Sequence, residues 1–519
     1  MGISDTCLPL NAALLLIVFA SPALAQVDQV RFGNLHAHTS YSDGSGTPKD
    51  AYTMACSSPG IDFFAITEHN HDKGDGKGDR KDGKMIATRP ELYRGKASSL
   101  VEMANRMDRP GRCVTIFGQE FSTINSGNHT NIFDIGDVIT VPNGDYARLL
   151  EWIEAHPDFG GSAPLLQFNH PATGRPAVRD YGRDDFGGSE TSWVQAMAPH
   201  ASLIEVFNAP ALRDGQRQRT ESRSSLYLKY LNLGFHLAPS VGQDNHYRNW
   251  GISTDARVVA ITPDFTRRGI IAALRARHAY ASEDYNLRIV FRAGNALQGD
   301  VVDPPPPGTE LPLTVEIVDD DEPNASYRID VFKDVAGGKP ASAPAETFEV
   351  TGNQTTPLPL EGVRLEQAGE YVLLRITQIG EEDDEHRIDD QAWTAPIWFE
   401  PAGRNLMQDA GPRLRIASLL PDPEGDDLHN EQITLKNLGV ASLSLVGWSV
   451  RDLAGNVWAL DALGEIGPAG QKTIARGSQP MSLNNGGDEI ELVAPDGLVI
   501  QTVGYPEVTT GELVTVDGR

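Results

Sequence analysis

The stretch VRFGNLHAHTSYSDG, residues 30–44, joins a short apolar run to two closely spaced histidines and an aspartate. Its first part, Val30–Leu35, has the length and apolar character of a β-strand, and His36 and His38 follow it directly. In an extended segment, side chains two residues apart point to the same side, so both imidazoles can face one site. The stretch therefore predicts a strand with metal-ligand side chains at its carboxyl end.

The same kind of strand-sized apolar run recurs along the next 220 or so residues of the chain. Several runs are continuously apolar, as in parallel strands that are buried on both faces, and segments such as 146–155 and 224–233 between them suit helices. Repeated strand–helix units predict an α/β barrel or a doubly wound sheet. The further runs are Ile61–Ile66, Val114–Phe117, Thr130–Ile135, Leu165–Phe168, Leu203–Phe207, Leu237–Val241 and Arg257–Ile261.

Ligand-type residues stand at the ends of these runs, mostly the carboxyl ends, which converge on one face of an α/β barrel. Imidazole and carboxylate groups suit Zn, Mn or Fe, and a carboxylate can bridge two ions. A single histidine at a strand end is more often a hydrogen-bonded core residue, but the whole set favours a metal site. Besides His36 and His38, the set contains His69, Glu120, His129, His170, Asp244 and His246.

These motifs resemble, in order, those of the polymerase and histidinol phosphatase (PHP) superfamily. The resemblance covers about residues 30–286 and implies a distorted (β/α)7 barrel with two or three divalent ions. Where the family usually has Asp before the second-motif histidine, this chain has Glu68. The motifs are His36-Ala-His38 to Asp43-Gly44, Ile66-Thr-Glu-His69, Gly118-Gln-Glu120 with His129, Asn169-His170-Pro171 and Gly242-Gln-Asp244-Asn-His246.

The resemblance also implies how the ligands are shared among the ions. One ion would take His36, His38, Glu120 and Asp244. A second would share Glu120 and add His129 and His170, and a third would take Asp43, His69 and His246. Some members carry His where Asp43 stands, so occupancy of the third site is open. Glu120, Asp244 and His246 are expected to act in catalysis, and the motif details look most like the exported, carbaryl-hydrolase-like branch.

Other charged residues leave two interpretations open. Glu205 could orient a ligand from behind or be a surface carboxylate at a strand end. Arg175, Arg248 and Arg277 could each clamp a phosphate or lie on the surface.

The chain changes character after the proline-rich segment 303–308, where alternating patterns predict small β-sandwiches. We expect a barrel at 26–288, an accessory sandwich at 289–402 and a last domain at 412–507. The last segment resembles a lamin-tail domain, which implies an immunoglobulin-like sandwich with Trp448 in its core. Such a domain would attach the protein to a surface or another protein. The resemblance rests on Glu431–Asn437, Leu445–Asp452, Leu483–Ile490 and Val503–Tyr505.

The N-terminus resembles a secretory signal at residues 1–25, although the first seven residues carry no Lys or Arg. Leu8–Ala20 is short for a membrane span, and Ala23-x-Ala25 suits cleavage; a retained anchor or a misassigned start is the alternative. We expect export to a periplasm or beyond the cell, with no membrane span after cleavage. In that compartment Cys56 and Cys113 could form one disulfide, but the sequence does not show that they meet.

The composition bounds the function further. A net charge of −27 repels nucleic acid at long range but does not exclude it as a substrate. We expect a hydrolase in which a metal-bridged hydroxide attacks a phosphorylated small molecule. The same site could instead hydrolyse a carboxyl ester or a carbamate. A third hypothesis is an extracellular binding protein whose β-domains are the functional part.

Overall fold

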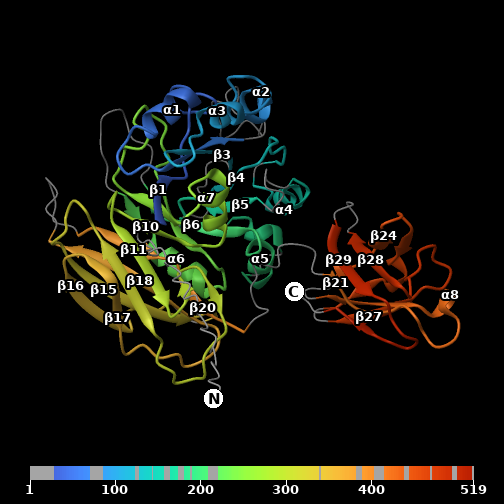
Figure 1. Ribbon diagram of the computed structural model, residues 1–519. Helices are drawn as coiled ribbons and strands as arrows, with labels where there is room; N and C mark the ends of the chain where they lie inside the picture. Colours follow the sequence, from blue (N-terminus) through green and yellow to red (C-terminus); the bar gives the residue numbers. More distant parts are fainter. Residues whose placement is uncertain are drawn as a thin grey trace, which may run out of the picture.

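The computed structural model describes residues 29–70, 86–122, 128–142, 144–156, 164–172, 181–186, 190–208, 220–337, 340–380, 389–401, 414–437, 443–467, 470–493 and 499–516 (Figure 1). The expected leader at 1–25, and with it the cleavage site, lies outside these residues, as does Arg175. Within these ranges, no helix has the length and apolar character to cross a membrane.

Most of the expected elements form where the apolar runs predicted them. Strands β5 and β9 have the expected bounds, and helix α4 covers Tyr146–Ala155. The strands concerned are β1 (Val30–Asn34), β2 (Phe63–His69), β3 (Val114–Phe121), β4 (Thr130–Phe133), β5 (Leu165–Phe168), β6 (Ala201–Asn208), β8 (Ala238–Gly242), β9 (Arg257–Ile261) and β10 (Ala279–Ser282). The larger helices around them are α1 (Pro48–Ala55), α3 (Leu100–Met107), α4, α5 (Glu190–Met197), α6 (Ser224–Asn232) and α7 (Arg267–Arg275).

The prediction of an α/β distorted (β/α)7 barrel is wrong. Strands account for 40% of the structure and helices for 17%, and the main sheet is a curled half-barrel of mixed direction. Strands β1, β2 and β3 are parallel, but β1–β9, β3–β4 and β4–β5 are antiparallel. An apolar run indicates that a strand is buried, but it does not indicate whether the strand is parallel or antiparallel to its neighbours. A helix between two strands does not settle direction either, because α4 lies between β4 and β5.

The main sheet continues across the expected boundary at residue 288. Strand β10 pairs with β19 (Gln391–Thr394), which pairs with β18 (Glu370–Ile379), and β18 also pairs with β15 (Ser326–Val335). A second sheet contains β11 (Arg288–Ala293), β14 (Leu313–Val318) and β17 (Gln354–Leu360). One apolar core joins the two regions, with Val30, Val259 and Tyr280 beside Val315 and Ile376. Residues 289–399 are β-rich as expected, but they share a sheet and a core with the residues before them.

The C-terminal segment has its own core and two four-stranded sheets, shown in orange to red in Figure 1. One sheet has the order β27-β22-β21-β30 and the other the order β25-β24-β28-β29. Trp448 is 4% exposed and Trp458 is fully buried between them. This is the expected immunoglobulin-like sandwich. Its strands are β21 (Leu414–Leu420), β22 (Gln432–Asn437), β24 (Ser449–Asp452), β25 (Val457–Ala459), β27 (Gln471–Ala475), β28 (Gly487–Val493), β29 (Val499–Pro506) and β30 (Val514–Thr515).

Helix α1 is fixed at both ends. Thr47 and Asp50 form a reciprocal capping box at its start, where Pro48 occupies the first turn without losing a hydrogen bond. At its end, Cys56 forms a disulfide with Cys113, which directly precedes β3. The two cysteines that the sequence could not pair therefore meet, and they hold α1 beside the strand that carries Glu120.

Candidate metal centre

The nine residues predicted as metal ligands lie in one cluster. Eight of them lie at or just after the carboxyl ends of β1, β2, β5 and β8, one residue before the end of β3, or directly before β4; Asp43 lies in the segment between β1 and α1. His36, His38 and Glu120 are almost fully buried, whereas Asp43, His129, His170, Asp244 and His246 have side chains that are 16–20% exposed. The cluster is therefore closed on one side and open to solvent on the other.

Glu120 is the centre of the cluster. Its Oε1 lies 3.1 Å from Nε2 of His36, 3.1 Å from Nδ1 of His129 and 3.3 Å from Nε2 of His170. Its Oε2 lies 2.9 Å from Nδ1 of His69 and 3.3 Å from Nε2 of His38. One carboxylate thus faces five imidazoles, which is the arrangement that a bridging ligand requires.

His36, His38 and Asp244 form a tight group with Glu120. Asp244 Oδ1 lies 3.3 Å from Nε2 of His36 and 3.2 Å from Nε2 of His38, and the two Nε2 atoms are 3.2 Å apart. One potential ligand atom from each of the four residues lies within 4.8 Å of the others. These four residues are the set expected for the first ion.

The residues expected for the third ion also come together. Asp43 Oδ1 lies 3.1 Å from Nε2 of His246 and 3.6 Å from Nε2 of His69. His38 belongs to this group by distance as well, and its ring stacks on that of His69 with centroids 4.4 Å apart.

The set expected for the second ion is arranged differently. Glu120 and His129 group with His69, which was assigned to the third ion. His170 still reaches Glu120, and its ring centroid lies 4.9 Å from that of His129. His69 is therefore placed between two of the expected sites.

The charges of the cluster stabilise one another. Burial raises the pKa of Glu120, but the imidazoles of His36, His69 and His129 outweigh it and hold that pKa well below its usual range. Burial likewise lowers the pKa of His36, but Glu120, Asp244 and Glu205 outweigh it and raise the pKa well above 6.5. At His129 burial prevails over Glu120 and lowers the pKa. The carboxylates are thus held ionised, the state in which they bind metal.

The donor set fits divalent ions. Glu120 Oε2 is buried and makes no hydrogen bond with any residue that the structure describes, although two imidazole nitrogens lie close to it. A buried carboxylate oxygen left without a hydrogen bond is costly, and a bound cation would satisfy it. Nitrogen and oxygen donors without cysteine are typical of Zn, Mn or Fe sites.

Two of these residues have unusual backbone conformations. His170 has φ +29° and Asp244 has φ +41°, in the left-handed region that L-residues rarely adopt. Each stands just past the end of its strand, β5 and β8. Such conformations cost about 1–3 kcal/mol and cluster at functional sites.

Sequence reasoning named Glu68 only as a departure from the PHP motif and did not single out Asn169. Glu68 is buried and accepts hydrogen bonds from the backbone of Thr39 and from the hydroxyls of Thr39 and Ser42, so it holds the segment after His38. Burial raises its pKa to about 7, against the effect of these hydrogen bonds. Asn169 donates to Glu120 Oε1 at 3.0 Å. The available signal was the polar residue directly before a predicted ligand, Glu68 before His69 and Asn169 before His170.

The interpretation of Glu205 as a surface carboxylate is wrong, since its side chain is fully buried and its Oε1 lies 2.7 Å from Nδ1 of His36. Arg277 is also placed away from the cluster. Its guanidinium donates to the carbonyl of Gly299 and lies over the ring of Trp398. Arg248 lies beside Gly46 and Asp50 at the start of α1.

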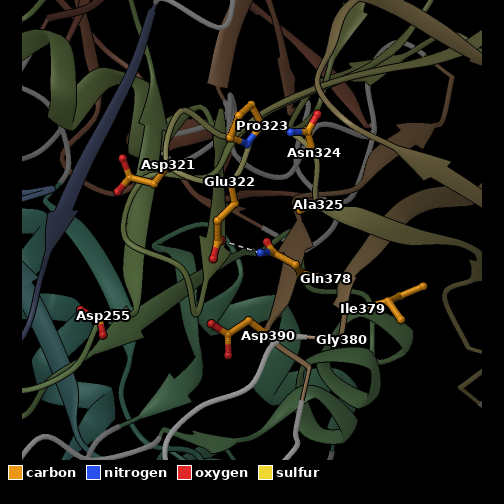
Figure 2. A pocket seen from close by; sticks show the side chains of 10 residues that line it. All are labelled: Asp255, Asp321, Glu322, Pro323, Asn324, Ala325, Gln378, Ile379, Gly380 and Asp390. Carbon is orange, nitrogen blue, oxygen red and sulfur yellow. Dashed lines mark hydrogen bonds between the residues drawn. The ribbon is translucent and has the colours of Figure 1, made fainter.

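An acidic pocket of about 630 Å³ lies elsewhere, between the two regions that share the main sheet (Figure 2). Asp255, Asp321, Glu322 and Asp390 line it, and none of the nine cluster residues does. Figure 2 shows the Glu322 side chain beside Gln378, which donates to it at 2.6 Å. Asp284 and Asp319 lie next to Glu322. None of the described residues that line this pocket is a histidine, and the proposed chemistry is assigned to the cluster around Glu120.

Comparison with known families supports one part of the chain. The family model of the lamin tail domain matches residues 408–507, in agreement with the sandwich described above. The C-terminal segment is therefore a lamin tail domain. The PHP resemblance of the preceding residues is not supported by a family match. No curated protein matches the chain.

Proposed function

We propose that this protein is a metal-dependent hydrolase of the PHP type, and specifically a phosphoesterase. The observation that carries the proposal is the Glu120 carboxylate, which five imidazoles approach within 3.3 Å. A purely structural glutamate needs one or two partners, whereas a bridging ligand needs ligands of two ions around it. The choice of a phosphoester follows the motif resemblance.

The position of each residue in the cluster determines which ion it would hold. His36, His38 and Asp244 would hold one ion on the closed side of the cluster, and Glu120 would join it to a second ion near His129 and His170. Asp43 and His246 would hold a third ion with His69. When bound, divalent ions activate water at neutral pH and neutralise the negative charge that develops on a phosphoester.

Substrate would approach from the exposed side of the cluster. Asp244 and His246 lie there, 19% and 17% exposed, with His129 and His170 beside them. The buried His36 and Glu120 would hold the geometry from below. The protein would leave the cell's reducing interior before it acts, in keeping with its disulfide.

The test is hydrolysis by the purified protein loaded with manganese. Three substrates are compared: bis-p-nitrophenyl phosphate, p-nitrophenyl phosphate and a naphthyl carbamate. Asp244→Ala should abolish turnover, and His156→Ala is the matched control because His156 stacks on Trp152 outside the cluster.

Turnover of either phosphate that is lost in Asp244→Ala and kept in His156→Ala would support a phosphoesterase. Carbamate turnover alone would make the protein a carbonyl hydrolase with the same metal site. A protein that binds no manganese and hydrolyses none of the three substrates would contradict the proposal and favour a binding protein.

A further inference from the structure

Glu205 lies behind the cluster, in the interior of β6, and no part of its side chain is exposed. Its two oxygens have different partners. Oε1 lies 2.7 Å from Nδ1 of His36 and accepts from Nε2 of Gln167 at 3.3 Å. Oε2 accepts from the backbone N–H of His170 at 2.6 Å and from Nδ2 of Asn208 at 2.8 Å. Every contact is therefore with a donor or with an imidazole nitrogen that can donate.

The contact with His36 fixes the role of each ring nitrogen. A carboxylate only accepts, so Nδ1 of His36 must carry the proton. That leaves Nε2 to face Glu120 and Asp244 at 3.1 and 3.3 Å, where it can bind an ion. In the other tautomer, a proton on Nε2 would occupy that position.

The contact with His170 acts on the backbone. His170 has φ +29°, and its N–H is held by Oε2 of the same carboxylate. This hydrogen bond fixes the turn after β5 from which the imidazole reaches Glu120. One carboxylate thus orients histidines assigned to two different ions.

The neighbouring strand leaves room for this carboxylate. Gly242, the last residue of β8, lies so close that a Cβ atom there would be 1.9 Å from Oε1 of Glu205. Asp244 follows two residues later. The glutamate therefore also fixes how close β8, and with it Asp244, comes to β6.

We infer that Glu205 is a positioning residue, which sets the tautomer of His36 and the backbone of His170 so that both present Nε2 to bound metal. The inference rests on the metal centre of the proposed function. Carboxylates that orient histidine ligands typically change metal affinity by about 10–100-fold when they are lost.

Glu205→Gln is the decisive variant because it keeps the shape and cannot satisfy both contacts. If the amide oxygen faces His36, the NH2 group meets the N–H of His170. If the NH2 group faces His36, it demands an unprotonated Nδ1 and moves the proton to Nε2. The control is Asp62→Asn, a half-buried carboxylate that accepts a hydrogen bond from the backbone N–H of Phe32 outside the cluster.

The first measurement is zinc and manganese affinity by chelator competition, with stoichiometry by elemental analysis. Glu205→Gln should bind at least one ion about 10–100-fold more weakly, and Asp62→Asn should bind as the unsubstituted protein does. Should Glu205→Gln fail to fold, Asn208→Ala removes one donor to Glu205 and should weaken binding by a smaller factor.

The second measurement needs no variant. In the zinc-loaded protein with ¹⁵N-labelled histidine, the ring signals of His36 should show a proton on Nδ1 and metal on Nε2. Equal metal affinity in Glu205→Gln, or metal on Nδ1 of His36, would overturn the inference and leave the hydrolase proposal standing. A protein that binds no metal would overturn both.

Discussion

The backbone N–H of His38 donates to the carbonyl of Asn245 at 2.8 Å, in an isolated parallel bridge between Ala37 and Asn245. Each of these two bridging residues is the middle of a ligand pair, His36-x-His38 and Asp244-x-His246. The bridge therefore sets the two pairs side by side, and the ring centroids of His38 and His246 lie 4.3 Å apart. One backbone contact thus brings together four predicted ligands from distant segments of the chain.

Glu120→Gln should lower kcat/KM by at least about a hundredfold, because the bridging charge would be lost at the centre of five imidazoles. Its metal content should fall as well. Glu370→Gln, a buried glutamate in β18, is the control and should keep both. Full activity in Glu120→Gln would remove Glu120 from the metal centre.

Removal of metal should lower the midpoint of thermal unfolding. A ligand that binds only the folded state stabilises it by roughly 3–4 kcal/mol at 100 to 1,000 times its Kd. Scanning calorimetry with and without a chelator measures this, and added manganese should restore the loss. In Asp244→Ala, which lacks a predicted ligand, the chelator should change the unfolding midpoint only slightly. An unfolding temperature that is the same with and without the chelator would mean that the cluster holds no ion.

Removal of the disulfide should destabilise the protein without touching the cluster. Cys56 and Cys113 are 57 residues apart, and closing a loop of this size contributes about 2–4 kcal/mol. The double variant Cys56→Ser with Cys113→Ser should unfold at lower urea and keep its metal stoichiometry. A change in stoichiometry would show that the bond also positions β3.

Acidic residues outside the cluster should make stability depend on pH. Burial, with Asp319 and Asp390 nearby, raises the pKa of Asp284 to about 7. A carboxyl whose pKa is raised on folding keeps its proton in the folded state, so its contribution to stability falls as pH rises from about 4 to about 7. Above about pH 7 the Asp284 carboxyl no longer makes this contribution to stability.

Asp284→Asn should remove this dependence, because the amide oxygen can still accept from the backbone of Asn286 and Leu287. At pH 8 the variant should melt a few degrees higher, where about 1 kcal/mol corresponds to roughly 2–4 °C; at pH 4 the two should coincide. Parallel melting curves across pH 4–8 would contradict the raised pKa.

Local features of the fold were predictable from the sequence. Strands β5 and β9 and helix α4 lie where the apolar runs placed them, because burial of alternate or continuous side chains leaves a local pattern. The lamin tail domain was predictable for a similar reason, since its turns and core residues are spaced along one short segment.

The candidate site was predictable as a set of residues but not as an arrangement. The ligand pairs are visible because side chains two apart share a side. The central place of Glu120 and the position of His69 between two groups depend on which strands pair. Glu205 was ambiguous for the same reason, since Gln167 and Gly242, which lie against it, come from two other strands, β5 and β8.

The sequence by itself indicated many of the strands and helices, the residues whose side chains suit metal binding, and the lamin tail domain at the C-terminal end of the chain. Only the tertiary structure decided the mixed direction of the main sheet, its continuation across residue 288 through β10 and β19, and the meeting of Cys56 with Cys113. The physical reason is that burial and turn chemistry act within a few residues. Strand direction and pairing are set by hydrogen bonds between segments far apart in the chain, and apolar side chains look the same in either direction.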